Sequence, residues 1–150
     1  MAFSRNDKLD GRLMPMVGGT KLHQYAHAND LASIKGMFIA DSEMNVDEHN
    51  SVDRRTALSI AADEGNTTIV AFLLSKGANP NSQCTIKRTP LSYAASQGHA
   101  KAVEELLNNA NTDKALEDCY GRTPADLAKE LITRVPAKKA DAETIIALLS

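Results

Sequence analysis

Tryptophan is absent from this sequence, and aromatic residues make up only 4% of its 150 residues. Alanine and leucine are plentiful instead, and this balance favours close-packed small helices over a sandwich of sheets. The chain is 43% hydrophobic and 24% charged, an ordinary composition that argues against a disordered chain. Its length suits one compact domain or one short array of repeats.

An excess of charge of one sign is lacking as well. The net charge is −2 at pH 7, so the chain has no global basic field of the kind that attracts nucleic acid or an anionic membrane surface. Cysteine is scarce: Cys84 and Cys119 do not have the CxxC spacing. Two thiols fit a reducing compartment, although the sequence leaves open one disulfide between them.

Long hydrophobic runs are missing too. No stretch approaches the roughly 18 consecutive apolar residues of a membrane-spanning helix. Charges are scattered through residues 1–19, where a signal peptide needs an unbroken apolar run. Glycine-rich phosphate-binding loops are also absent. We therefore expect a cytoplasmic protein that binds no membrane, no nucleic acid and no cofactor.

What the sequence does contain is an internal repeat. A threonine that opens each copy recurs about every 34 residues along the chain. The four copies are GTKLHQYA at 19–26, RTALSIAADEGN at 55–66, RTPLSYAASQGH at 88–99 and RTPADLA at 122–128. A second phrase follows the middle two, TTIVAFLLSKGANPN at 67–81 and AKAVEELLNNANTDK at 100–114.

Each copy is expected to form a helix, a tight turn, a second helix and a loop. Thr56, Thr89 and Thr123 suit N-caps, and in two copies a proline follows at the first helical position, where a missing N–H is tolerated. Gly65 and Gly98 supply the left-handed residue that an abrupt reversal needs. The second helix then carries an apolar face at helical spacing.

This unit resembles the ankyrin repeat, whose pattern reads roughly G-x-T-P-L-H-x-A-A-x-x-G-H-x-x-I-V-x-x-L-L-x-x-G-A-x-x-N. The resemblance covers residues 16–150 and implies an all-α ankyrin-repeat solenoid of about four helix-turn-helix repeats with loop or hairpin connections. The repeats are expected at about 16–49, 50–82, 83–115 and 116–150, after an N-terminal tail or cap at 1–15.

The first and last repeats depart from the pattern, as expected for units that cap a stack. In the first repeat, Asn29 stands where the turn glycine belongs. In the last repeat, an insertion within 131–142 precedes the second helix. We predict an exposed loop or an extended first helix there.

Ser92 and His99 invite interpretation as a nucleophile and its base. By repeat alignment, however, Ser92 falls in the position of His23, Ser59 and Asp126. The resemblance implies that this side chain points into the stack and forms hydrogen bonds near the helix start. His99 occupies a framework position after the turn. Since a nucleophile needs an oriented base and oxyanion donors, we predict that the protein is not an enzyme.

His23 and His27 lie four residues apart, which places two imidazoles on one face of a helix. They lack the glutamate of an HExxH motif and an obvious third ligand. The alternative interpretation is a framework His23 beside a surface His27. We predict no metal site, and metal binding through this pair is kept as an alternative function.

An arginine precedes the capping threonine in three successive repeats, and we call Arg55, Arg88 and Arg122 the arginine row. The resemblance assigns this row to the concave face of the stack. One interpretation is a binding site for an acidic segment of another protein. The other is a scaffold row whose charges pair with local acids. The candidate acids are Asp53, Asp63, Glu64 and Glu130.

Further contact positions are expected at the loop tips and at the ends of the first helices. Ile86 and Tyr120 at loop tips either contact a partner or pack on adjacent loops. Together with the arginine row, the predicted partner-binding residues are Val52, Asp53, Arg55, Asp63, Glu64, Thr85, Ile86, Arg88, Ser96, Gln97, Cys119, Tyr120 and Arg122.

The sequence therefore predicts a monomeric, non-catalytic interaction module, or scaffold, that binds another protein through its concave face and loop tips. Three alternatives are left open. The first is the targeting subunit of a larger complex. The second is a secreted bacterial effector that is delivered into a host cell and acts on a host protein. The third is a self-associating structural protein. The sequence identifies neither the partner nor the source.

Overall fold

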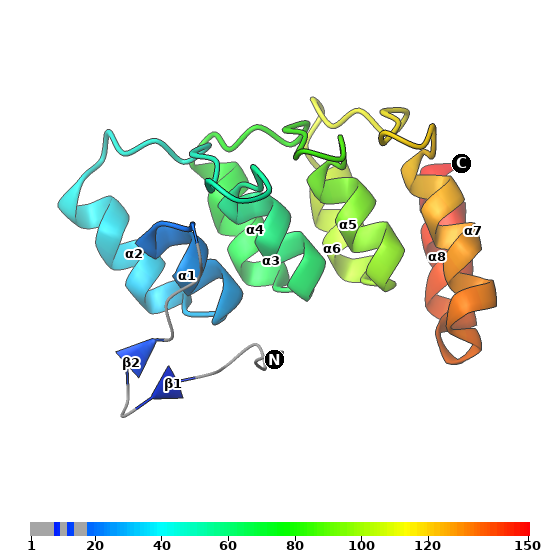
Figure 1. Cartoon of the computed structure of the whole chain (residues 1–150), viewed down its shortest axis with the longest axis horizontal. Coiled ribbons are helices and arrows are strands. Elements are labelled where there is room, and N and C mark those ends of the chain that lie inside the picture. The colour runs from blue at the N-terminus through cyan, green and yellow to red at the C-terminus, as the bar shows by residue number, and fades with distance from the viewer. Residues whose placement is uncertain (1–7, 10–11, 14–17) are drawn as a thin grey trace.

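The computed structural model describes residues 8–9, 12–13 and 18–150 of the chain. This part of the chain contains eight α-helices in four successive pairs (Figure 1). They are α1 (Lys21–His27), α2 (Leu31–Ala40), α3 (Ala57–Glu64), α4 (Thr67–Ser75), α5 (Pro90–Gln97), α6 (Ala100–Leu107), α7 (Pro124–Arg134) and α8 (Lys139–Leu149), with a short 3₁₀ helix, η1 (Pro136–Lys138), before the last. The predicted all-α repeat solenoid is confirmed.

Near the N-terminus, β1 (Lys8–Leu9) pairs with β2 (Arg12–Leu13) in an antiparallel register, with Lys8 opposite Leu13. The rest of the predicted tail at 1–15 lies outside the described residues. The boundaries expected between the repeats stay predictions. None of the described helices is both long and apolar enough to cross a membrane.

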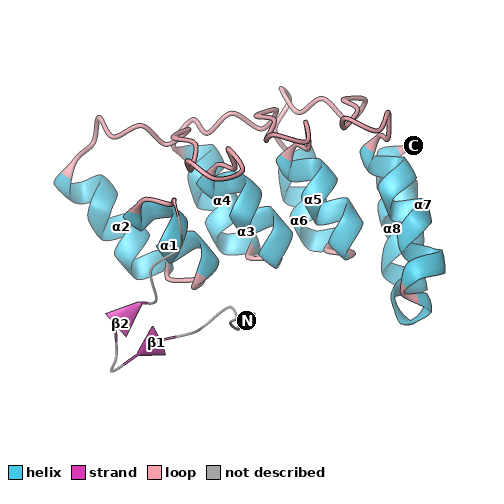
Figure 2. Cartoon of the chain, viewed as in Figure 1, coloured by secondary structure: helices cyan, strands magenta, loops and turns pink. Residues whose placement is uncertain are grey.

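The helices form two layers. The first helices of the pairs, α1, α3, α5 and α7, pack side by side, and α4, α6 and α8 form a second layer against them. The long loops all run along one edge of the stack (Figure 2). In the second layer α2 is the exception, because its backbone makes few contacts with α4, whereas α4 packs closely on α6.

Small side chains let the first helices approach one another. Ala61, Ala62, Ala94 and Ala95 are all completely buried in α3 and α5. Around them lies an aliphatic core that runs the length of the stack. Its largest completely buried members include Leu22, Ile34, Leu58, Ile69, Leu73, Leu91, Leu106, Leu127, Leu131 and Ile145.

The predicted helix ends are confirmed. The threonine at the start of α3, α5 and α7 accepts a hydrogen bond from the backbone N–H three residues on. Gly65 and Gly98 end α3 and α5 with left-handed φ angles of 73° and 78°. After α1, Asn29 takes the same conformation at 58°, which asparagine tolerates better than most residues.

The insertion in the last repeat lengthens its first helix, which was one of the two predicted outcomes, and its second helix is longer as well, which was not predicted. α7 and α8 each have 11 residues, against 8 in α5 and α6. The additional turns reach the end of α5. Arg134 donates to the carbonyl oxygen of Ser96 at 2.5 Å, and Lys138 donates to that of Gln97 at 2.6 Å. The last repeat therefore caps the C-terminal end of α5.

Candidate functional site

Similar turns, the first of them one residue longer than the other two, position the three members of the arginine row. In each turn the residue before the arginine has a positive φ, 60° at Arg54, 60° at Lys87 and 73° at Gly121. The carbonyl oxygen of each arginine accepts a backbone hydrogen bond from the first residue of its turn, at 2.9 to 3.1 Å. Because the backbone repeats, the arginines leave it at equivalent points of three successive repeats.

Arg55, the first member of the row, is held by its own repeat and by the next. Its Nη2 lies 3.0 Å from Oδ2 of Asp63, one of the predicted acids. Its guanidinium also lies 4.3 Å from the ring centroid of Tyr93, within the range of a cation–π contact. The other predicted acid of this turn, Asp53, accepts the backbone N–H of Arg55 at 3.2 Å.

Arg122, at the other end of the row, binds two carboxylates. Its Nε donates to Oδ2 of Asp118 at 3.0 Å, and its Nη1 donates to Oε2 of Glu130 at 2.9 Å. Its guanidinium lies 4.9 Å from the ring centroid of the exposed Tyr120. Glu130 thus pairs with the row as predicted. Both carboxylates that bind Arg122, those of Asp118 and Glu130, belong to the same repeat as the arginine.

Asp118 is the acid that the sequence analysis missed. Its carboxylate is fully buried, and Oδ1 accepts the backbone N–H groups of Tyr120 and Arg122 at 2.9 and 3.0 Å. Burial alone would raise the pKa of Asp118, but the hydrogen bonds from the backbone and side chain of Arg122 outweigh it, so the pKa is lowered. A signal existed, because Asp118 aligns with Asn50, whose Oδ1 accepts three backbone N–H groups of its own turn.

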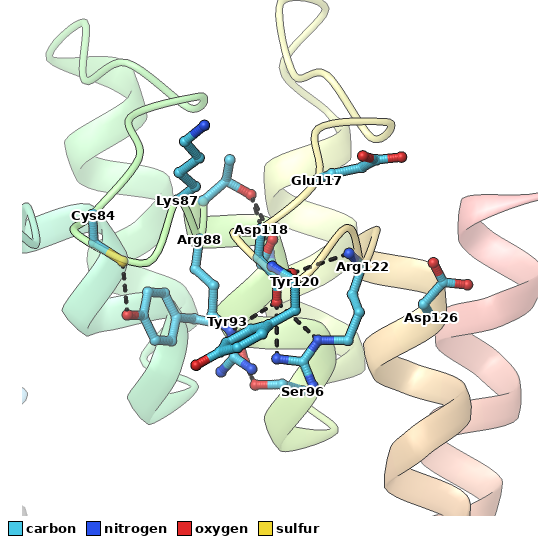
Figure 3. Close-up of polar contacts among 12 residues, drawn as sticks. Cys84, Lys87, Arg88, Tyr93, Ser96, Glu117, Asp118, Tyr120, Arg122 and Asp126 are labelled. Atoms are coloured by element: carbon cyan, nitrogen blue, oxygen red, sulfur yellow. Dashed lines mark hydrogen bonds and ion pairs between the residues drawn. The ribbon is translucent and has the colours of Figure 1, made fainter.

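Arg88, the central member, is the least paired. Its Nε lies 3.5 Å from Oδ2 of Asp118, the oxygen that Arg122 already binds, and it forms no hydrogen bond within the described residues. Its guanidinium is 5.9 Å from the ring centroid of Tyr93. Figure 3 shows Arg88 and Arg122 converging near Asp118 with the rings of Tyr93 and Tyr120 beside them. One carboxylate thus faces two guanidinium groups.

Tyr93 was also missed as part of this site. Its ring lies within cation–π range of both Arg55 and Arg88, and its hydroxyl lies 3.1 Å from Sγ of Cys84. Burial raises the pKa of Tyr93 far above its ordinary value, so the ring stays neutral. In the repeat alignment this position holds Ile60 in α3, so the aromatic substitution was the available signal.

The structure brings the predicted loop tips together. Successive tips are joined by backbone hydrogen bonds of 2.9 Å, from Thr85 to the carbonyl of Asp53 and from Cys119 to that of Ile86. Ile86 is half-buried, as expected if it packs on an adjacent loop. Of the predicted contact residues at these tips, Val52, Thr85, Cys119 and Tyr120 are exposed.

The predicted positions at the ends of the first helices mainly connect neighbouring repeats. Gln97 donates to Oδ1 of Asp63 at 3.1 Å, and Glu64 lies 3.2 Å from Nδ1 of His27. Ser96 is only 3% exposed, and its hydroxyl donates to the carbonyl oxygen of Tyr93. The structure therefore does not present the side chain of Ser96 to a partner.

The residues that first suggested catalysis lie in framework positions. Ser92 is buried, and its backbone N–H donates to Oγ1 of Thr89 at 3.2 Å. His99 places its Nε2 2.9 Å from the carbonyl oxygen of Asp63. Cys84 is a buried free thiol, and Cys119 is an exposed one.

His23 and His27 do not form a metal site in this arrangement. Both ring nitrogens of His23 are hydrogen-bonded, Nδ1 to Thr20 and Nε2 to the carbonyl oxygen of Arg55. A metal ion would have to break one of these bonds inside the core. Across the part of the chain that the structure describes, no cluster of three or more metal-ligating side chains occurs.

Comparison with known proteins gives one family. Residues 53–85 match the model described as ankyrin repeat, and residues 77–135 match the one described as ankyrin repeats (3 copies). The inactive serine/threonine-protein kinase TEX14 of Bos taurus is 35% identical over 120 residues, which is 80% of this chain and 7% of that protein.

Two further relatives share the repeats. Rabankyrin-5 of Mus musculus is 35% identical over 77 residues, 51% of this chain and 7% of its own length. A putative ankyrin repeat protein of Rickettsia bellii is 33% identical over 109 residues, 70% of this chain and 46% of its own length. The chain therefore spans under a tenth of the first two relatives and under half of the third.

Proposed function

The chain belongs to the ankyrin-repeat family, whose repeats are modules of protein–protein interaction, and from this premise we propose that it binds another protein through the arginine row and the exposed loop tips. Recognition uses a largely preformed surface, so little ordering accompanies binding. The module is non-catalytic, monomeric and cytoplasmic in this proposal.

The observation that carries the proposal is the incomplete pairing of Arg88. Arg55 and Arg122 each have a carboxylate within 3.0 Å. Arg88 has only the longer contact to Asp118, and its terminal amino groups donate no hydrogen bond within residues 18–150. A carboxylate from a partner would supply the missing acceptors, because guanidinium binds carboxylate in a two-pronged geometry.

Two exposed side chains extend this surface. Tyr120 is 71% exposed on the face of Arg122, and Val52 is 61% exposed two repeats away. Tyrosine and arginine are the residues most often found at the energetic centre of protein interfaces. We therefore propose a partner segment that combines acidic residues with an apolar side chain.

Replacement of Arg88 by glutamine tests the proposal. Arg88→Gln removes the charge and keeps most of the stem beside Tyr93, whereas Arg88→Glu would place a second carboxylate beside Asp118 and disturb folding. We expect capture of the partner from cell lysate, quantified by mass spectrometry, to fall about tenfold, or about 1.4 kcal/mol. Thermal unfolding should move little, because Arg122 still pairs with Asp118.

The matched control is Lys101→Gln, which removes an exposed cation from α6. This variant should capture the same proteins as the wild type. For the wild type, rising salt should reduce capture, because the attraction is between opposite charges. Equal capture by both variants would make the arginine row a scaffold feature and contradict the proposal.

A further inference from the structure

In the second layer, α2 and α4 stand farther apart than the other neighbouring helices, α4 and α6 or α6 and α8. Because the two backbones make few contacts, aromatic side chains fill the space between them. Phe38 of α2 and Phe72 of α4 meet edge to face, with ring centroids 5.5 Å apart and planes at 78°. Both rings are only partly buried.

An open hollow lies over these rings. It has a volume of about 240 Å³ and is lined by Lys35, Phe38, Ile39, Phe72 and Lys76. Ile39 is 86% exposed, the largest exposure among the big hydrophobic side chains of the described residues. Burying such a side chain against a partner would be favourable, because it removes apolar surface from water.

The repeat fold requires an apolar residue at only part of this surface. Counting from the residue that precedes each second helix, Ser75 and Asn108 occupy the position of Ile39 in the next two repeats. Glu105 occupies the position of Phe72 in the third repeat. The position of Phe38 is apolar in all three repeats, since Leu74 and Leu107 occupy it in the next two and all three pack against the core. Ile39 and Phe72 are therefore the apolar residues that the pattern of the repeat does not require.

Two lysines border the hollow. The Nζ of Lys76 lies 5.8 Å from the ring centroid of Phe38 and 5.5 Å from that of Phe72, and the Nζ of Lys35 lies 5.9 Å from the latter. Within the described part of the chain, neither lysine pairs with a carboxylate. The hollow thus combines an apolar floor with two unpaired positive charges.

We propose that this hollow is a second docking site, which binds a segment of a partner protein that carries an apolar side chain flanked by carboxylates. Pockets for small molecules run from about 300 to 1,000 Å³, so a hollow of about 240 Å³ suits a side chain or two better than a cofactor. The flanking carboxylates would pair with Lys35 and Lys76. The site lies on α2 and α4, away from the arginine row, and does not depend on the function proposed above.

A titration of the full chain with a short peptide of sequence EEFLEE, followed by heteronuclear NMR, tests this proposal. We expect chemical-shift changes centred on Lys35–Ala40 of α2 and Phe72–Lys76 of α4. The peptide KKFLKK has the same apolar residues with the opposite charge and should bind at least about tenfold more weakly. Binding of both peptides with equal affinity would overturn the charge argument.

Variants then separate this site from the arginine row. Lys35→Glu combined with Lys76→Glu should weaken EEFLEE binding about tenfold or more, and Ile39→Ser, which installs the residue of the second repeat, should also weaken it. Lys101→Glu and Arg88→Gln should bind as the wild type does. Shifts that follow the arginine row, or wild-type affinity of the double variant, would overturn the proposal. Sedimentation supplies one more test. A dimer that Ile39→Ser abolishes would also overturn the proposal, because the occupant of the hollow would then be a second copy of this chain.

Discussion

His23 is a buried side chain held in one protonation state by its neighbours. Its Nδ1 accepts the backbone N–H of Thr20 at 3.1 Å, so the proton sits on Nε2, which donates to the carbonyl oxygen of Arg55 at 3.1 Å. Burial lowers the pKa of His23 below its ordinary value, and the hydrogen bond to Arg55 opposes this only in part. Folding therefore keeps a neutral imidazole inside the first repeat.

This arrangement predicts a loss of stability in mild acid. Because the unfolded chain protonates His23 near pH 6.5 and the folded chain does so only at lower pH, the free energy of unfolding should fall as the pH drops below about 6.5. His23→Ser installs the residue found at Ser59 and Ser92. It should be less stable at neutral pH, and the difference in its urea midpoint between pH 7 and pH 5 should shrink.

The control for this measurement is His27→Gln. His27 lies near the surface with its Nδ1 3.2 Å from Glu64, outside the buried hydrogen bonds of His23. Its removal should leave the loss of stability in acid in place. An unchanged pH dependence in His23→Ser would show that other groups cause the effect.

At this scale, alignment of the repeats predicted the framework positions and two of the acids that pair with the arginine row, Asp63 and Glu130, but not Asp118. Ser92 and His99 lie where the alignment put them, since each repeat uses the same hydrogen bonds. The partner of Arg88 depends on whether the next turn begins with an acid, as it does at Asp118. The pattern of residues around each arginine does not contain this contact between repeats, so the sequence left both interpretations of the row open.

Among the elements, the extended α7 shows how an insertion changes its neighbour. The last carbonyl groups of a helix have no partner within it, and cations near this end are favoured by the helix dipole. Arg134 and Lys138 supply donors to the carbonyl oxygens of Ser96 and Gln97 at the end of α5. The sequence left open an exposed loop or an extended first helix here, and it could not predict which carbonyls that helix reaches.

Removal of the donor on Arg134 should destabilise the fold through the end of α5. Arg134→Met keeps an apolar stem and loses the hydrogen bond to Ser96, which should lower the free energy of unfolding by about 0.5 to 1.5 kcal/mol. Lys139→Met removes a cation whose nearest acid, Glu143, is 3.7 Å away on the surface. It should cost less than about 0.5 kcal/mol. Urea unfolding at constant m-value measures both, and equal losses would contradict the capping role.

On the scale of the whole molecule, the helices at the centre of the stack are more deeply buried than those of the first pair. In α5, 7 of 8 residues are buried, and the helix packs between α3 and α7. In α2, by contrast, only Ile34 of its 10 residues is buried, and α4 stands off from it. Repeat arrays derive their stability from contacts between neighbours. The first pair of helices should therefore open locally at a lower free energy than the centre of the stack.

Amide hydrogen exchange measures this difference directly. In the native state, the amides of α2 should exchange at least about tenfold faster than those of α5, a gap of about 1.4 kcal/mol in opening free energy. Uniform protection along the chain would instead mean that all four pairs open together.

Faster exchange in α2 would link stability to recognition, because an occupant of the hollow between α2 and α4 would add the neighbour contacts that α2 lacks. Saturation with EEFLEE should then slow exchange in α2 while leaving α5 unchanged, and a change confined to α5 would contradict this coupling.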